Sequence, residues 1–164
     1  MVEEQLNPET VAREHAQVSA DIKRLGNIAT ELDEIGEPFT VAQWASRVEE
    51  RPRQLLAQFH QLITSFEKGL TEHFAREERY LPELTRRLGS PAVAESLLSD
   101  HRRMSGMLRA ICDRVRDLAS SQLGEESKQA QLHEVTKTLR DLTGQLQGHA
   151  DKEDEVLFIM GHNT

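Results

Sequence analysis

Six side chains of the kinds that bind metal ions occur in a repeated pattern along the sequence. Each of two glutamates follows a histidine by four residues, and a further histidine stands earlier in the chain than each of these pairs. In chain order the six residues are His15, His73, Glu77, His101, His149 and Glu153. Residues four apart on a helix lie on one face, so each pair can offer a nitrogen and an oxygen to a single site. The pattern predicts a metal centre built from imidazoles and carboxylates.

Four long segments with apolar residues at three- and four-residue spacing are expected to be the helices that carry these side chains. They span about residues 7–35, 52–81, 91–120 and 125–160. Pro82 is expected to kink or end the second segment, and residues 39–51, around Trp44, are expected to form a short extra helix. Short breaks make neighbouring segments antiparallel. We therefore expect an all-α fold, an up-down-up-down antiparallel four-helix bundle that forms a single domain over residues 1–164.

The six candidate ligands are expected to share one level of that bundle. His15 and His101 lie about 8 to 10 residues from the starts of their helices, whereas His73 and His149 lie about 8 to 11 residues from the ends of theirs. At about 1.5 Å per residue, antiparallel packing puts all four in one layer some 12 to 16 Å below one end. No Lys or Arg stands in the apolar stripes, and burying these groups bare would cost several kcal/mol each. A metal ion supplies the missing positive charge.

The number of candidate ligands predicts two metal ions rather than one. Four imidazoles and two carboxylates exceed the needs of one tetrahedral zinc. The only cysteine, Cys112, excludes internal disulfides, thiolate zinc sites and iron–sulfur ligation by several cysteines. A ligand set without thiolates favours iron or manganese over zinc. If Glu77 and Glu153 each bridge, two ions about 3.5 to 4 Å apart would each have two histidines.

At these residues the sequence resembles the hemerythrin-like, or HHE, cation-binding domains, over roughly residues 7–160. The matching features are Glu14-His15, the run HFAREERYLP from His73 to Pro82, Asp100-His101, and the run HADKEDEVLF from His149 to Phe158. The resemblance implies a non-heme diiron centre, in which residues at the six positions above ligate two iron ions with an oxo or hydroxo bridge.

Two positions depart from the pattern of the respiratory hemerythrins. Those proteins look similar but carry another histidine four residues after the third-helix one, where this chain has Ser105. They also place an aspartate five residues after the fourth-helix histidine. Asp154 has that spacing and is a rival to Glu153, although the apolar stripe turns Glu153 inward. The four-histidine pattern is closer to bacterial iron–sulfur-repair and eukaryotic iron-sensing relatives, which argues against a plain oxygen carrier.

Other polar residues are expected to stay outside the metal centre. His60 and His133 turn away from it at about 100° per residue, and His162 stands in the C-terminal tail, where we expect disorder. Arg76, Glu78 and Arg79 are expected to be a solvated face. Tyr80, on the same face as the second-helix histidine, has two interpretations: a packed aromatic, or a gating, hydrogen-bonding or metal-ligating residue.

The charge balance excludes several classes of partner. Lys and Arg total 20 against 28 Asp and Glu, a formal net charge of -8, so the chain has no general attraction for nucleic acid or anionic lipid. The first ten residues lack the apolar core of a signal peptide. No apolar run approaches the roughly 18 residues of a membrane span. We expect a cytoplasmic protein.

The expected function is that of a diiron protein that binds or reduces a small ligand, namely dioxygen, nitric oxide or a peroxide. Its role would be sensing or defence against oxidative or nitrosative stress. The alternative is iron binding without catalysis, in storage, transfer or iron sensing. A bundle that binds partners without any metal is a third interpretation. The sequence does not separate the first two, and it leaves open the oligomeric state and whether the chain is an enzyme.

Overall fold

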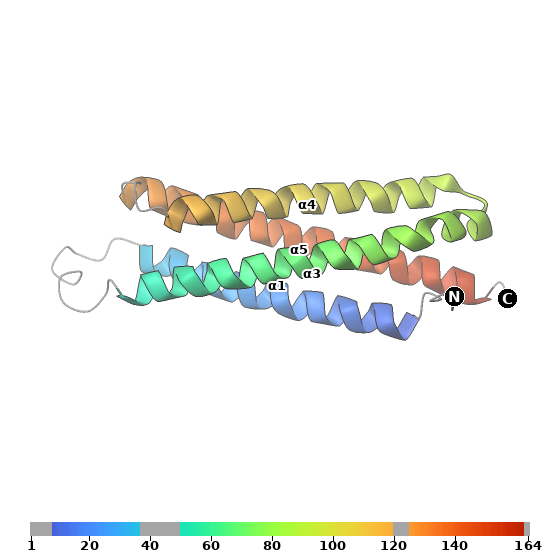
Figure 1. Ribbon diagram of the computed structural model, residues 1–164, viewed down its shortest axis with the longest axis horizontal. Coiled ribbons are helices and arrows are strands. Elements are labelled where there is room, and N and C mark those ends of the chain that lie inside the picture. The colour runs from blue at the N-terminus through green and yellow to red at the C-terminus, as the bar shows by residue number, and fades with distance from the viewer. Residues whose placement is uncertain (1–7, 37–49, 120–124, 163–164) are drawn as a thin grey trace.

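The computed structural model describes residues 8–36, 50–119 and 125–162. Nearly all of them belong to four helices, which are α1 (Pro8–Gly36), α3 (Glu50–Leu88), α4 (Pro91–Ala119) and α5 (Glu125–His162). Successive helices run in opposite directions along a common axis (Figure 1). Both α1 and α4 pack against α3 and α5, so the four helices enclose a shared interior. The expected all-α, up-down-up-down four-helix bundle is confirmed.

The helix boundaries follow the apolar periodicity closely except at the end of α3. There the helix continues through Pro82 to Leu88, so the expectation that Pro82 could end it is wrong. A proline has no N–H to donate to the carbonyl four residues before it, which weakens a helix. Packing offsets this loss, because Leu81 and Leu84 are buried in a cluster with residues of α4 and α5.

The turn between α3 and α4 is two residues long. Gly89 adopts a φ of 64°, in the left-handed region that favours glycine, and its N–H donates to the carbonyl of Thr85 over 2.9 Å. Ser90 then precedes Pro91, the first residue of α4, where the fixed φ of proline suits a helix start. The short turn makes α3 and α4 antiparallel neighbours.

The expected short helix over residues 39–51, which includes Trp44, lies almost wholly outside the described residues. Residues 50 and 51 are the exceptions, and they form the start of α3. The assignment of residues 1–164 to a single domain stays a prediction.

The apolar faces of the helices fill the interior in two clusters. The larger cluster occupies most of the length of the bundle and includes Leu70, Phe74, Met104 and Leu146. The smaller cluster lies toward the end where α3 passes to α4, and consists of Leu81, Leu84, Ala94, Leu97 and Val156. A layer of polar side chains separates the two clusters. Within the described ranges, no helix is both long enough and apolar enough to cross a bilayer.

Candidate metal centre

All six candidate ligands lie in the polar layer between the two apolar clusters. Each helix contributes one histidine, and α3 and α5 each add a glutamate one turn later. The buried members are His73, Glu77, His101, His149 and Glu153, all less than a tenth exposed. The remaining member, His15, has a side chain that is 12% exposed. The prediction that these residues share one level of the bundle is therefore confirmed.

The six residues form two groups that share both glutamates. One group contains His15, His73, Glu77 and Glu153, and the other contains Glu77, His101, His149 and Glu153. In each group, one nitrogen or oxygen atom from every residue lies within 4.8 Å of those from the others. Each group is compact enough to surround one metal ion, with a histidine pair of its own and a share in both carboxylates.

The two oxygens of Glu77 face different histidine pairs. Oε1 lies 2.7 Å from Nε2 of His73, which belongs to the first group. Oε2 lies 3.1 Å from Nε2 of His101, which belongs to the second. A carboxylate in this orientation can bridge two ions by giving one oxygen to each.

Glu153 repeats the arrangement from the opposite helix. Its Oε2 lies 2.8 Å from Nε2 of His15, and its Oε1 lies 3.7 Å from Nε2 of His149. Each of the four carboxylate oxygens in the layer thus faces a different histidine. The two glutamates and the four histidines form a near-symmetric set of donors around two positions.

Among the described residues, several of these buried atoms have no hydrogen-bond partner of suitable geometry. Those that face the centre are Nε2 of His15, both carboxylate oxygens of Glu77, and Oε2 of Glu153, and on the outer side Nδ1 of His149 is also without a partner. The short distances between these nitrogens and oxygens are therefore not hydrogen bonds. They are expected of ligand atoms whose lone pairs all point at one centre. Each unpaired buried polar group costs about 1–3 kcal/mol. A cation removes that cost, and nitrogen and oxygen donors without thiolates suit iron or manganese.

Charge interactions in the layer favour bound positive charge. Burial lowers the pKa of His15, but the carboxylates of Glu153 and Glu77 outweigh burial and raise this pKa to about 10. Burial also lowers the pKa values of His73 and His101, and contact with Glu77 outweighs it and raises both. Burial raises the pKa of Glu77, yet its contacts with the histidines hold that pKa well below the usual range. The layer therefore attracts either protons or metal cations.

The outward-facing nitrogens of two histidines meet carboxylates at hydrogen-bond distance. Nδ1 of His73 lies 2.8 Å from Oε2 of Glu14 on α1, and Nδ1 of His101 lies 3.0 Å from Oε1 of Glu78 on α3. The interpretation of Arg76, Glu78 and Arg79 as a purely solvated face is incomplete, because Glu78 is exposed and still contacts a buried histidine. A carboxylate at Nδ1 leaves Nε2 free to bind a metal ion.

A third carboxylate stands near His149, and two cations hold the outer carboxylates. Nδ1 of His149 lies 3.8 Å from Oδ2 of Asp100, which Lys152 also contacts at 2.6 Å. Arg76 contacts Glu14 at 3.0 Å in the same way. Each cation stands three residues after the histidine of a His-x3-Glu pair. The two halves of the bundle therefore have matching ion pairs outside the central ligands as well.

Phe74 packs directly against the histidines of the layer. Its ring is stacked on that of His101, with the centroids 4.1 Å apart and the planes 11° apart. The same ring meets His149 edge-on at 5.8 Å. The apolar spacing that predicted the interior of α3 did not include Phe74, because the residue lies one position beyond His73 on the helix.

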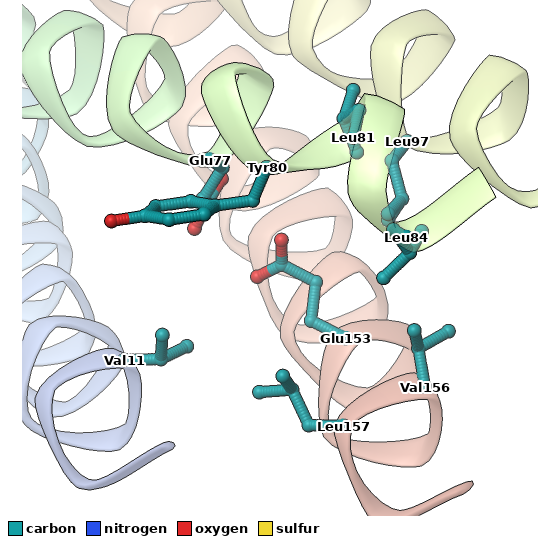
Figure 2. A pocket seen from close by; sticks show the side chains of 9 residues that line it. All are labelled: Val11, Glu77, Tyr80, Leu81, Leu84, Leu97, Glu153, Val156 and Leu157. Carbon is teal, nitrogen blue, oxygen red and sulfur yellow. The ribbon is translucent and has the colours of Figure 1, made fainter. Parts of the chain in front are cut away.

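A small pocket opens from this layer toward the end of the bundle where α3 passes to α4 (Figure 2). The lining residues are Val11, Glu77, Tyr80, Leu81, Leu84, Leu97, Glu153, Val156 and Leu157. The carboxylate of Glu153 points toward Glu77, and the ring of Tyr80 lies beside Glu77 (Figure 2). The space open to the centre of a water-sized molecule is ≈ 30 Å³, and one water needs about 10–15 Å³. The pocket has room for a molecule of two or three atoms beside the carboxylates.

The rival candidates lie elsewhere. Asp154 is exposed, whereas Glu153 beside it is buried in the layer. His60 and His133 are exposed, in agreement with the expectation that they turn away. The backbone of His162 is helical as the last residue of α5, where disorder was expected, and its side chain lies outside the description.

Comparison with known families finds one match. The family model described as hemerythrin HHE cation binding domain matches residues 7–160, a range that contains all six candidate ligands and the pocket beside them. No curated protein and no solved structure matches the chain.

Proposed function

The chain belongs to the hemerythrin HHE cation-binding domain family, and from this premise we propose that it is a non-heme diiron protein that binds or reduces a small ligand. The ligand class is dioxygen, nitric oxide or a peroxide, and the role is sensing or defence against oxidative or nitrosative stress. The proposed ligands of the two iron ions are His15, His73, Glu77, His101, His149 and Glu153.

One observation carries this proposal. Each of the two buried glutamates directs one oxygen to the first histidine pair and the other oxygen to the second, as at Glu77, with distances of 2.7 Å and 3.1 Å. A single ion in either group would leave part of this donor set unused. Two ions bridged by both carboxylates, with an oxo or hydroxo bridge between them, would use all of it, and the absence of thiolates favours iron.

The side chains around the centre have distinct tasks in this proposal. An iron pair, when bound, supplies coordination positions for a small ligand and electrons for its reduction. Glu77 and Glu153 offset the charge of the cations, and the histidines hold them in place. Leu81, Leu97 and Val156 form an apolar wall between the carboxylates and the end of the bundle, which restricts water.

The pocket favours ligand binding over iron storage or transfer. It reaches both carboxylates, and its space of ≈ 30 Å³ is enough for a diatomic molecule or a peroxide. A storage or transfer protein needs a route for iron and has no use for an apolar chamber of this size. A small ligand entering along this pocket would arrive beside Glu77 and Glu153.

Mixing the reduced, iron-loaded protein with nitric oxide or hydrogen peroxide tests the proposal. We expect a saturable change in the optical spectrum and fast loss of the added ligand. Val156→Phe fills the pocket and should slow this reaction with the iron content unchanged. Ile159→Phe places the same ring at an exposed position of α5 and should leave the rate unchanged. Iron retention without any reaction would favour the storage alternative and contradict the proposal.

A further inference from the structure

The four histidines differ in the support of their outward-facing nitrogens. Nδ1 of His101 meets Glu78 at 3.0 Å, and Nδ1 of His149 stands 3.8 Å from Asp100. Among the described residues, no carboxylate lies at Nδ1 of His15, whose contacts with carboxylates are made through Nε2. The distance to Asp100 is too long for a hydrogen bond, and Nδ1 of His149 has no hydrogen-bond partner among the described residues. Each pair therefore has one ring held by an outer carboxylate, His101 in one pair and His73 in the other.

Packing and burial differ between the two histidine pairs. Phe74 stacks on His101 and meets His149 edge-on at 5.8 Å, and it approaches His73 at 5.9 Å, so one buried ring contacts both members of the second pair and one member of the first. The side chains of these two histidines are 3% and 2% exposed, against 12% for His15. The ring contact of His15 is an edge-on approach to His73 at 5.3 Å. His15 is thus the least restrained of the four histidines.

We propose that Glu14 and Glu78 are positioning residues for the histidines, and that the closer packing of His101 and His149 makes the two ion positions unequal. The ion held by His101 and His149 is bound more tightly, and the ion held by His15 and His73 is released first. This inference rests on the proposed function, because it requires that the chain bind two ions.

The physical basis is the orientation of the imidazole rings. A ring that donates its Nδ1 hydrogen to a carboxylate has a fixed tautomer and a fixed angle, and its Nε2 becomes a more basic ligand. A ring without that contact must lose rotational freedom when it binds an ion, which lowers the affinity. Each position has one ring oriented in this way, His73 by Glu14 and His101 by Glu78. The positions differ because the second ring is closely packed at one of them (His149) and more exposed at the other (His15).

Stepwise removal of iron from the loaded protein tests the inference. EDTA is added in graded amounts, and the iron retained per chain is measured together with the near-ultraviolet absorption of the centre. We expect two separate release midpoints in the wild type. His15→Ala should abolish the release at low EDTA and keep the one at high EDTA, whereas His149→Ala should abolish the release at high EDTA.

Substitutions of the outer carboxylates separate positioning from a general loss of stability. Glu78→Ala should lower the affinity of the tighter ion about 10- to 100-fold and leave the weaker one nearly unchanged, and Glu14→Ala should do the reverse. Glu78→Gln keeps an acceptor for the Nδ1 hydrogen and should restore most of the affinity. Glu72→Ala removes an exposed carboxylate that pairs with Lys68 on the same helix and should change neither midpoint.

Two results would overturn the inference while leaving the proposed function intact. One is loss of both ions at a single midpoint, and the other is a Glu78→Ala protein whose tighter midpoint equals that of the wild type. A wild type that never holds two ions would instead contradict the proposed function, and the inference with it.

Discussion

Oε2 of Glu14 lies 2.8 Å from Nδ1 of His73, although the two residues are 59 positions apart in the sequence. Asp100 stands at 3.8 Å from Nδ1 of His149 in the other half of the bundle. Both acids directly precede a histidine of the layer. In each half, the histidine of this dipeptide points to the central carboxylates, while its acid faces the histidine of the neighbouring helix.

Glu77→Ala or Glu153→Ala should each remove at least one of the two ions, because each carboxylate faces both histidine pairs. The measurement is the iron content of the purified variants. Circular dichroism of the same samples shows whether each variant keeps the helix content of the wild type. Asp154→Ala, His60→Ala and His133→Ala change exposed side chains and should keep both ions. If Asp154→Ala lost iron and Glu153→Ala did not, the assignment of the α5 ligand would be wrong.

The level at which the site lies could be predicted because it depends on regular geometry alone. A helix rises by a constant amount per residue, so the depth of His15 and His149 followed from the segment ends and an antiparallel arrangement. Burial of Glu153 and exposure of Asp154 followed from the apolar period in the same way.

The contacts outside the central ligands depend on side-chain conformations and helix rotations, and the apolar spacing of the sequence does not specify these. Glu78 reaches His101 because of the rotation of α3 against α4 and the length of a flexible side chain. The stacking of Phe74 on His101 also depends on how α3 is rotated against α4. The helix continues through Pro82 because packing of Leu81 outweighs the missing backbone hydrogen bond, and no local propensity contains that balance.

Metal-free protein should be most stable in mildly acidic solution. The pKa of His15 is raised from 6.5 to about 10, so its contribution to the free energy of unfolding is complete below pH 6.5 and is lost as the pH rises to about 10. The pKa of Glu77 is lowered from 4.5, so its contribution is present above pH 4.5 and is lost as the pH falls. Calorimetry should give the highest Tm between pH 4.5 and 6.5.

His15→Gln should flatten the alkaline part of this profile, because the variant has no raised histidine pKa at position 15. If the Tm of the metal-free wild type instead increased from about pH 7 to pH 10, the raised pKa of His15 would be wrong.

Ser105→His should slow the reaction of the reduced protein with dioxygen. Ser105 is half-buried on α4, one turn from His101, and an imidazole there can fill a coordination position that the wild type leaves for a small ligand. Stopped-flow mixing should show oxidation of the wild type and oxidation of the variant that is slower by about tenfold, which corresponds to about 1.4 kcal/mol added to the barrier. A wild type that takes up and releases dioxygen without oxidation would contradict this prediction.

Cys112 should be a slow nucleophile in the folded protein. Burial, together with the nearby charge of Glu67, raises the pKa of this thiol from 9.0 to about 12, and Sγ donates to Oε2 of Glu67 over 3.6 Å. Because the thiolate is the reactive form, alkylation by iodoacetamide at about pH 8 should be at least a hundredfold slower than in the unfolded chain. Glu67→Gln should accelerate it, and equal rates in the folded and unfolded chains would show that the thiol is not shielded.

The proposed function requires that this bundle hold two iron ions between Glu77 and Glu153. Iron content measured together with the near-ultraviolet spectrum of protein from iron-replete cells tests it most directly. We expect about two iron ions per chain and the absorption of an oxo-bridged ferric pair. Glu77→Ala should lower both the iron content and this absorption. A reproducible single zinc ion per chain without that absorption would contradict it.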